Sequence, residues 1–281
     1  MEISAQTALC GIVLHPAGHT RSPAMHNAAY AALGLDAVYL AFDVAPARLE
    51  GAVTGMRALG LRQLSVSLPH KQSIQAYLDE LDETARRIGA VNTVVRRGDR
   101  LCGSNTDWLG AVKALERETS LAGKRAVVLG AGGTARAVVY GLRERGAHVR
   151  VLNRTVERAR ALARELGAEE SGSLAELSRA PWQVLVNTTS VGLGEDVSPV
   201  AAGELVDGAV VMDAVYQPER TRLLRDAEAR GARAISGKWM LVHQAVAQLE
   251  AWSARKAPVE AMADAFDRAG KTPARSGGQA E

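Results

Sequence analysis

Cysteine is scarce in this chain, and so are the apolar segments that a membrane or secreted protein requires. Only two of the 281 residues are cysteines, Cys10 and Cys102, which excludes a disulfide framework. Both lie in apolar, strand-like runs, so we expect two buried free thiols in a reducing compartment. The N-terminus lacks the features of a signal peptide, and no apolar stretch approaches the length of a membrane span. The sequence therefore predicts a cytoplasmic protein.

An excess of charge of one sign is also missing. Lysine and arginine together number 34 and the acidic residues 31, which leaves a net charge of +3. The isoelectric point is about 9.0, but the charges are interspersed and no aromatic-basic patch occurs, so we expect no nucleic-acid partner. The histidines lack the spacing of a zinc site, and we expect no metal. The partner that remains is a small molecule.

A glycine-rich turn lies near the middle of the chain. A β-branched run at residues 126–129 leads into Gly130 and Gly132, and a helical pattern and a second strand at residues 148–152 follow. This order of strand, glycine turn, helix and strand is typical of a dinucleotide-binding unit. Gly130 would permit the tight turn, and Gly132 would let the backbone approach a pyrophosphate at the start of the helix. Ala135 supplies the small residue of the third fingerprint position.

The patterns before this unit predict the first domain of a two-domain α/β fold. Strand and helix patterns alternate, which favours a mostly parallel sheet with an antiparallel edge. Ser22 and Pro23 are typical of an N-cap followed by proline at the first helical position. We expect strands at residues 9–14, 38–44, 63–68, 93–97 and 101–104, and helices at residues 22–33, 49–59, 72–78 and 82–88.

The second half of the chain predicts a doubly wound sheet of the Rossmann type. Further strands are expected at residues 184–186, 210–212 and 232–235, with helices at residues 156–166 and 221–230. A helix at residues 108–118 would link the domains. An apolar helix at residues 239–252 is followed by no strand, so we expect it to return to the first domain. The polar, glycine-rich C-terminal segment is expected to be a disordered tail.

Polar side chains follow several of the expected strands, where sheets of this class bind ligands. Hydroxyls, amides, one ammonium and one carboxylate would suit a small substrate with several hydroxyls and a carboxylate. Each also has a structural interpretation, because Ser22 can be an N-cap, Asn105 and Asp107 can cap the linking helix, and Lys71 can be a solvated lysine. The residues are Thr20 and Ser22 after the first strand, Ser65, Ser67 and Lys71 around the third, and Asn92, Asn105, Thr106 and Asp107 at the ends of the hairpin.

Short motifs resemble those of the shikimate dehydrogenase family and occur in the same order. T-R-S-P-A-M-H-N-A is similar to the family's S-x-S-P segment, and it is followed by V-S-L-P-H-K, G-A-V-N-T, N-T-D, G-A-G-G-T-A-R-A, N-R-T, N-T-T-S-V-G and M-L-V-H-Q-A. The resemblance spans residues 10–252. It implies reduction of 3-dehydroshikimate to shikimate with NADPH, a step in aromatic amino-acid biosynthesis. It also implies a substrate domain, a Rossmann cofactor domain and a C-terminal helix that rejoins the first domain.

The resemblance further implies roles for the residues at matching positions. Lys71 and Asp107 would be the catalytic pair and would both contact the substrate. The other substrate contacts would be Thr20, Ser22, Ser67, Asn92, Tyr216 and Gln244. The cofactor contacts would be Gly130, Ala131, Gly132, Gly133, Thr134, Asn153, Arg154, Thr155, Arg158, Ala214 and Gly237, with a weaker match at Glu83.

These matches, together with the patterns, set the expected domain bounds. Residues 1–107 and 239–268 would form the substrate-binding catalytic domain, and residues 108–238 the NADP-binding domain. Residues 269–281 would be the disordered tail. The protein is expected to be a monomer or a homodimer.

Several positions depart from the family's pattern. Thr20 replaces the first serine of S-x-S, Ser65 and Ser67 replace the polar residues of N-V-T, and Trp108 replaces a smaller residue after N-T-D. These changes bear on substrate choice more than on reaction type. A quinate/shikimate dehydrogenase that uses NAD is therefore one alternative. A non-catalytic regulator that binds metabolites of the pathway is another, although a pure binder needs no proton-transfer pair such as Lys71 and Asp107.

The end of the second strand of the dinucleotide unit predicts the choice of cofactor. An enzyme that uses NAD carries an acidic residue there, about 20 positions after the fingerprint, to bind the ribose 2′-hydroxyl. Here the strand ends in Asn153, Arg154 and Thr155, with Arg158 one turn later. Two guanidiniums can bind a 2′-phosphate, and no carboxylate stands there to repel it. The sequence therefore predicts NADP.

The substitution Arg154→Ala tests this assignment. It is expected to weaken the binding of NADPH more than that of NADH, because only NADPH carries the 2′-phosphate that the guanidinium would bind. Titration of the variant and the unsubstituted protein with each cofactor measures the difference. An equal loss of affinity for both cofactors would contradict the assignment.

Overall fold

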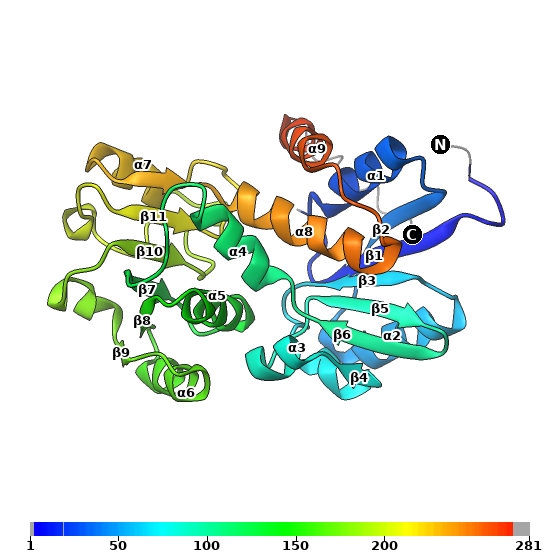
Figure 1. Cartoon of the computed structure of the whole chain (residues 1–281), viewed down its shortest axis with the longest axis horizontal. Coiled ribbons are helices and arrows are strands. Elements are labelled where there is room, and N and C mark those ends of the chain that lie inside the picture. The colour runs from blue at the N-terminus through cyan, green and yellow to red at the C-terminus, as the bar shows by residue number, and fades with distance from the viewer. Residues whose placement is uncertain (1–2, 19, 272–281) are drawn as a thin grey trace. The chain divides into compact units, whose positions relative to one another are not determined.

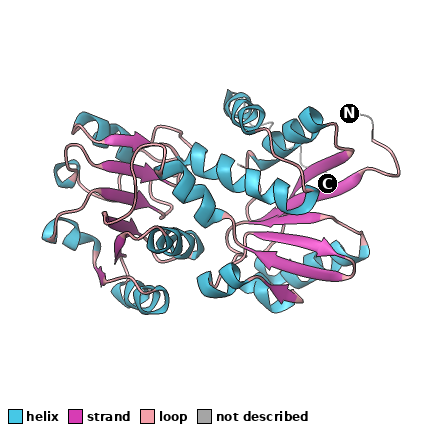
Figure 2. Cartoon of the chain, in the orientation of Figure 1, coloured by secondary structure: helices cyan, strands magenta, loops and turns pink. Residues whose placement is uncertain are grey.

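The computed structural model describes residues 3–18 and 20–271, which fold into two compact units. Both units contain helices and strands (Figure 2). The first unit combines the described parts of Met1–Asp82 and Ala245–Glu281 with Val91–Ser104, and the second consists of Glu83–Ala90 and Asn105–Gln244. Each unit is thus assembled from segments that are far apart in the sequence. Residues 83–90, 105–107 and 239–244 belong to the second unit, whereas the sequence assigned them to the first.

The first unit is built on a mixed sheet. Its strands are β1 (Ala8–Leu14), β2 (Ala37–Asp43), β3 (Gln63–Val66), β4 (Glu80–Leu81), β5 (Thr93–Arg97) and β6 (Arg100–Ser104), in the order β2-β1-β3-β5-β6-β4. β1 pairs in parallel with β2 and β3, and β4 pairs in parallel with β6. β5 is antiparallel to both of its neighbours, so the antiparallel strand lies inside the sheet and the expected antiparallel edge is wrong. The edge strand β4 has two residues, too few for a pattern to predict it.

The helices of the first unit are α1 (Ser22–Leu33), α2 (Leu49–Ala58) and α9 (Val259–Lys271), with the 3₁₀ helices η1 (Pro46–Arg48) and η2 (Ser73–Tyr77). α1 and α2 begin and end close to the expected residues. Gly34 ends α1 with a φ of 61°, a conformation that favours glycine. The segment at 72–78 forms a 3₁₀ helix rather than an α-helix.

The start of α1 and the C-terminal helix α9 differ from what the sequence predicted. Arg21 is the N-cap of α1 and Ser22 is its first residue, so the expected serine N-cap is wrong. α1 packs against α9, which the sequence did not predict as a helix. α9 extends to Lys271, three residues into the segment expected to be a disordered tail, and residues 272–281 of that segment lie outside the described residues.

The second unit is built on a parallel sheet. Its strands are β7 (Arg125–Leu129), β8 (His148–Leu152), β9 (Glu170–Gly172), β10 (Val184–Asn187), β11 (Val210–Asp213) and β12 (Arg233–Ile235), in the order β12-β11-β10-β7-β8-β9. All neighbouring pairs are parallel. The strand order reverses at β7, so the predicted doubly wound sheet is confirmed. β9, with three residues, was not predicted.

Helices cover both faces of the parallel sheet. The helices of this unit are α3 (Glu83–Ile88), α4 (Asp107–Leu115), α5 (Gly133–Glu144), α6 (Val156–Leu166), α7 (Arg222–Ala229) and α8 (Gly237–Ser253), with the 3₁₀ helices η3 (Leu174–Arg179) and η4 (Ala202–Glu204). α3 packs against α5. Val128 and alternate strand residues pack with α4, α5 and α6, whereas Val127 and Leu129 pack with α7 and η3. Figure 1 shows α5 and α6 near β7, β8 and β9. α8 begins in the second unit and ends in the first.

Both cysteines are free thiols, as expected. Cys10 is fully buried, and this burial raises the pKa of its thiol to about 11. Cys102 is only half-buried, so the expectation that both are buried is wrong for this residue. Its thiol donates to a carboxylate oxygen of Glu80 at 3.3 Å.

In the part of the chain that the structure describes, no helix has the length and apolar character needed to cross a membrane.

A buried arginine fastens the connection after β9 to the sheet. Arg150 of β8 is 8% exposed. Its guanidinium donates to the carbonyl oxygens of Glu176, Leu177 and Ala180 at 3.1, 2.8 and 3.3 Å. Burial lowers the pKa of Arg150. Glu176 and Leu177 lie within η3 and Ala180 follows it directly, so the guanidinium supplies hydrogen-bond donors to three carbonyls of this connection.

Replacing this guanidinium is expected to destabilise the fold. Arg150→Met keeps an apolar stem but leaves buried carbonyls without donors, which should lower the free energy of unfolding by about 2–4 kcal/mol. Urea denaturation measures the loss. Arg179→Ala is the matched control, because Arg179 lies in η3 but forms only an exposed ion pair with Glu176, for which we expect a change below about 1 kcal/mol. Equal stability of the two variants would contradict the role of Arg150.

Candidate active site

Polar residues of the first unit gather where β1 and β3 end. The two strands are parallel, so their carboxyl ends lie at the same edge of the sheet. The backbone N–H of Ser67 donates to the carbonyl of Val13 at 3.0 Å, which continues the pairing beyond β3. Thr20 and Ser22 follow β1, and the Thr20 hydroxyl accepts a hydrogen bond from the N–H of Ser22 at 3.3 Å. The N-cap of α1 is Arg21, whose side chain makes no capping hydrogen bond.

Lys71 and Asn92 lie at the same edge of the sheet. The N–H of Val91 donates to the carbonyl of Lys71 at 2.7 Å, and the N–H of Val66 donates to the carbonyl of Asn92 at 2.8 Å. Lys71 is 9% exposed and Asn92 is 1% exposed. The first unit therefore brings together the segments that carry Ser67, Lys71 and Asn92. An ammonium held beside hydroxyls and an amide can bind and polarise an oxygen-rich small molecule.

Ser65 is used inside the fold rather than at this edge. It is 3% exposed. Its hydroxyl accepts from Tyr39 Oη at 2.6 Å and from Gln63 Nε2 at 2.9 Å, and it donates to Gln248 Oε1 at 2.8 Å. Gln248 Nε2 in turn donates to the carbonyl of Asn92 at 3.0 Å. Ser65 thus supports the backbone of Asn92, and the expectation that it belongs with the ligand-facing hydroxyls is wrong.

In the second unit, Asp107 and Gln244 lie on helices that pack closely. Asp107 is the first residue of α4 and is 4% exposed. Thr106 donates from its hydroxyl to the carbonyl of Gln244 on α8 at 3.1 Å. A Cβ added at Gly110 would lie 2.5 Å from the carbonyl oxygen of Met240, so only glycine permits this approach. The contact between α4 and α8 therefore positions Asp107 and Gln244 near each other.

The glycine turn between β7 and α5 has the geometry of a pyrophosphate site. Gly130 has a φ of +113°, and an added Cβ would lie 2.6 Å from Thr188 Oγ1. An added Cβ at Gly132 would meet nothing within 4 Å, and this residue is exposed. Gly133 begins α5, so the N–H groups of its first turn lie next to this open space. The residues present therefore fit a dinucleotide, whose pyrophosphate would accept from these donors. Ala131 and Thr134 belong to the same turn.

The end of β8 presents two arginines to solvent. Asn153 Nδ2 donates to the carbonyl of Thr155, the N-cap of α6, at 2.9 Å. Arg154 and Arg158 are exposed, and within the described part of the chain neither forms an ion pair with a carboxylate. Two guanidiniums close to the dinucleotide turn remain available to a phosphate group.

Ala214, Tyr216 and Gly237 lie together beyond the end of β11. The N–H of Ala214 donates to the carbonyl of Asn187 at 2.8 Å. A Cβ added at Gly237 would lie 2.7 to 2.8 Å from the carbonyl oxygens of Ala214, Asp213 and Val215, so α8 can begin here only with glycine. Tyr216 is half-buried in the same loop. Glu83 lies elsewhere, exposed at the first residue of α3, and its role remains a prediction.

The sequence reasoning missed two buried polar residues at the ends of β10 and β11. Asn187 and Asp213 are both fully buried, and Asn187 Nδ2 donates to Asp213 Oδ1 at 2.9 Å. Both side chains follow runs of valine in parallel strands, which is the position where this fold binds ligands. Asn187 stands in the motif N-T-T-S-V-G and Asp213 directly precedes Ala214, so their positions after strands were the signal available.

Three family models match the chain. They describe a shikimate dehydrogenase substrate binding domain at residues 12–94, shikimate / quinate 5-dehydrogenase at residues 112–191 and a shikimate 5′-dehydrogenase C-terminal domain at residues 237–265. The chain is 46% identical to the shikimate dehydrogenase (NADP(+)) of Thermococcus kodakarensis, over 90% of this chain and 93% of the relative. It is 45% identical to the enzyme of the same name from Symbiobacterium thermophilum, over 90% and 92% of the two chains.

Solved structures resemble both units. A shikimate dehydrogenase in complex with NADP+ has a TM-score of 0.91 at 37% identity and covers 95% of this chain and 97% of its own. The shikimate 5-dehydrogenase of Thermus thermophilus in complex with NADP(H) and shikimate has a TM-score of 0.88 at 38% identity, with 94% and 100% covered. The quinate dehydrogenase of Corynebacterium glutamicum in complex with NAD has a TM-score of 0.85 at 30% identity, with 93% and 99% covered.

Proposed function

The chain belongs to the shikimate dehydrogenase family, and we propose that it is an NADP-dependent shikimate dehydrogenase. It would reduce 3-dehydroshikimate to shikimate reversibly with NADPH, as a step of the shikimate pathway of aromatic amino-acid biosynthesis. The observation that carries the proposal is the edge of the first sheet, where the segments of Ser67, Lys71 and Asn92 are joined by backbone hydrogen bonds. A molecule with several hydroxyls and a carboxylate needs this set of groups, and Thr20 and Ser22 add two more hydroxyls.

The choice of NADP over NAD is supported by the end of β8. Arg154 and Arg158 are exposed there, and no acidic residue takes the place that binds the 2′-hydroxyl of NAD. The adenosine 2′-phosphate would bind these two guanidiniums, and the pyrophosphate would bind the first turn of α5. Two relatives with the same cofactor in their names share 45–46% of their residues with this chain.

Lys71 and Asp107 would carry the proton chemistry. NADPH, when bound, supplies the hydride. The ammonium of Lys71 would stabilise the negative charge that develops on the substrate oxygen, and the pair would deliver the proton that this oxygen takes up. Asp107 would also accept a hydrogen bond from a substrate hydroxyl. The other proposed substrate contacts would hold the reacting carbon of the substrate in line with the nicotinamide carbon that transfers the hydride. These contacts are Thr20, Ser22, Ser67, Asn92, Tyr216 and Gln244.

The two units would divide these tasks. We propose that the first unit binds the substrate through Thr20, Ser22, Ser67, Lys71 and Asn92. The second unit would bind NADP through its glycine turn and Arg154, and it would add Asp107, Tyr216 and Gln244 to the substrate contacts. Free thiols at Cys10 and Cys102 support a reducing, cytoplasmic location. The protein would act as a monomer or a homodimer.

A direct assay tests the function. Purified protein is incubated with shikimate or quinate, each with NADP or NAD, and the absorbance of the reduced nicotinamide is followed. Oxidation of shikimate with NADP as the preferred pair is the expected result. Preference for quinate and NAD would favour the quinate dehydrogenase alternative, and binding of shikimate without turnover by any pair would favour a metabolite-binding regulator.

The substitution Lys71→Ala is expected to act mainly on kcat. Loss of the ammonium removes an interaction that strengthens in the transition state, so kcat should fall by about 10²-fold or more. The KM for shikimate should change much less, because Thr20, Ser22 and Asn92 remain. Lys256→Ala, at an exposed lysine of the same unit, is the control and should leave both constants unchanged. If Lys71→Ala raised KM and left kcat nearly intact, Lys71 would only anchor the substrate.

The substitution Asp107→Asn is expected to change both constants. The amide keeps the shape of the side chain but can no longer take part in proton transfer, and it also weakens a hydrogen bond to the substrate. Steady-state kinetics in the oxidation direction should show a lower kcat together with a higher KM for shikimate. A variant with unchanged kcat would remove Asp107 from the catalytic pair.

A further inference from the structure

The carboxylate of Asp213, at the end of β11, is fully buried, and both of its oxygens accept hydrogen bonds. Oδ1 accepts from Asn187 Nδ2 at 2.9 Å and from the N–H of Val215 at 3.0 Å, and Oδ2 accepts from Thr221 Oγ1 at 2.7 Å. Burial raises the pKa of Asp213 to about 6, against the opposing effect of these hydrogen bonds. Because the pKa in the folded protein exceeds the ordinary value, ionisation costs stability increasingly from the ordinary pKa up to about pH 6, and the cost is complete above it. A residue kept at such a cost calls for an explanation.

The partners of Asp213 connect three segments of the second unit. Asn187 ends β10, Val215 lies in the loop that follows β11, and Thr221 is the N-cap of α7. Asn187 also binds the start of the loop after β10, because its Oδ1 accepts from the N–H of Thr189 at 3.0 Å and from the Thr189 hydroxyl at 2.7 Å. The starts of both loops and the first turn of α7 are thus tied to one carboxylate.

The same network reaches the glycine turn. Thr188, between Asn187 and Thr189, donates from its hydroxyl to the carbonyl of Leu129 at 2.6 Å and from its N–H to the same oxygen at 2.9 Å. Leu129 ends β7, and its neighbour Gly130 lies against Thr188. Hydrogen bonds therefore connect α7 to the end of β11, the end of β11 to the end of β10, and the loop after β10 to the dinucleotide turn.

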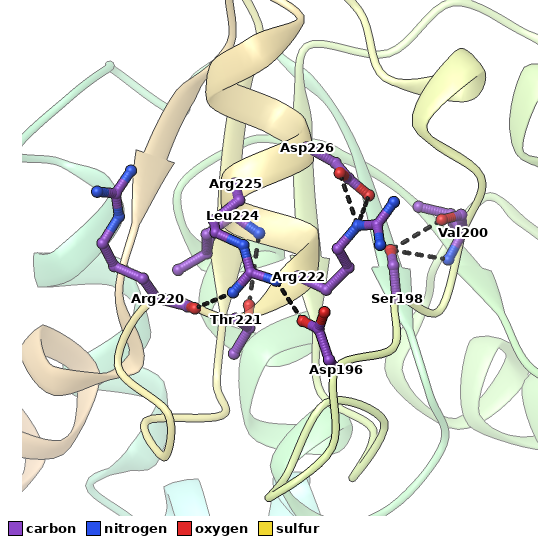
Figure 3. Close-up of polar contacts among 9 residues, drawn as sticks. All are labelled: Asp196, Ser198, Val200, Arg220, Thr221, Arg222, Leu224, Arg225 and Asp226. Carbon is purple, nitrogen blue, oxygen red and sulfur yellow. Dashed lines mark hydrogen bonds and ion pairs between the residues drawn. The ribbon is translucent and has the colours of Figure 1, made fainter.

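Side chains of the first turns of α7 also contact these loops (Figure 3). Arg225 forms an ion pair with Asp196, in the loop after β10, and donates to the carbonyl of Arg220 at 3.0 Å, in the segment before α7. Thr221 Oγ1 accepts from the N–H of Leu224 at 3.4 Å, which caps the helix. Residues 188–200 and 214–220 are therefore both fastened to α7.

These two loops belong to one half of the dinucleotide fold. In a doubly wound sheet each half binds one mononucleotide. Arg154 and Arg158 follow β8 and mark the half that would take the adenosine. The loops after β10 and β11 follow the strands of the other half, which would take the nicotinamide. Ala214 and Tyr216, with proposed cofactor and substrate roles, lie in the second of these loops.

We propose that Asp213 is a positioning residue for hydride transfer. By joining Asn187 to Thr221, it holds the loops 188–200 and 214–220 in the arrangement that sets the nicotinamide ring against the substrate. This inference rests on the proposed function. Because a small displacement of a reacting group has a large effect on rate, loss of the network should lower kcat by about 10-fold or more. The Kd for NADPH should change by less than about 3-fold, since the adenosine contacts lie in the other half.

Thr221 provides the sharper test, because its substitution leaves no buried cavity. Thr221→Val keeps the shape but removes the donor to Asp213 Oδ2 and the acceptor that caps α7, whereas Thr221→Ser keeps the hydroxyl and both of these contacts. We expect Thr221→Val to lower kcat for shikimate oxidation while its NADPH titration remains close to that of the unsubstituted enzyme, and Thr221→Ser to restore kcat. Arg222→Ala is the control on the same helix, because Arg222 forms only a surface ion pair with Asp226, and it should leave kcat unchanged.

Asp213 itself is tested with a second matched pair. Asp213→Ala removes all three acceptor contacts and should lower kcat as Thr221→Val does. Asp213→Asn keeps an oxygen for Asn187 and Val215 and an amide that can donate to Thr221, so it should retain most of kcat. Normal kcat in Thr221→Val and Asp213→Ala would overturn the proposal. So would a loss of kcat that follows Tm in every variant, including Thr221→Ser and Asp213→Asn, because this pattern would indicate a merely structural role.

The fluorescence of bound NADPH separates this inference from the proposed function. It reports on the surroundings of the reduced nicotinamide without any turnover. Thr221→Val should change the emission of bound NADPH, and Thr221→Ser should not. If the unsubstituted protein binds NADPH but oxidises neither shikimate nor quinate, the proposed function fails while this measurement still tests the positioning of the nicotinamide. Unchanged emission in Thr221→Val would overturn the inference by itself.

Discussion

Parallel pairing of strands is the interaction on which both halves of this protein depend. A parallel strand needs a crossover connection, so helices cover the faces of the sheet, and valine and leucine fill both sides of β7, β10 and β11. A polar side chain on such a face needs buried hydrogen-bond partners, as Arg150 of β8 and Ser65 of β3 have. Other polar side chains lie at the ends of the strands, and parallel strands bring these ends to one edge. The positions of Ser67, Asn187 and Asp213 all follow from this constraint.

The elements that the sequence predicted well are those with a strong local signal. α6 coincides with the expected residues 156–166, and Gly34 ends α1 because its positive φ suits glycine. β4 and β9 were missed because two or three residues cannot show a period. The place of β5 inside the sheet was missed for another reason. The hairpin is local, but its pairing with β3 joins residues about 30 positions apart, and no local pattern reports it.

The candidate site divides in the same way. The glycine turn and the position of the two arginines directly after β8 could be predicted from local sequence patterns. That these groups bind phosphate stays a prediction. Asp213 and Thr221 could not be predicted in this way, because either residue alone has an ordinary interpretation as a strand end or a helix cap. Their meaning comes from a hydrogen bond between buried side chains, which in turn connects to Asn187 on another strand. Spacing along the chain carries no information about such a bond.

The structure also bears on which of the residues that depart from the family pattern could affect the choice between shikimate and quinate. The hydroxyl of Ser65 is hydrogen-bonded to Tyr39, Gln63 and Gln248 inside the first unit. The serine at this position therefore affects hydrogen bonds within the fold rather than contacts with a ligand. Trp108 packs edge-on against Tyr140 of α5, with ring centroids 5.5 Å apart, and so contributes to the core of the second unit. Neither side chain needs a substrate to explain it. Thr20 remains, half-buried after β1 with a methyl group that serine lacks. Discrimination between shikimate and quinate should therefore respond to Thr20→Ser more than to changes at Ser65 or Trp108.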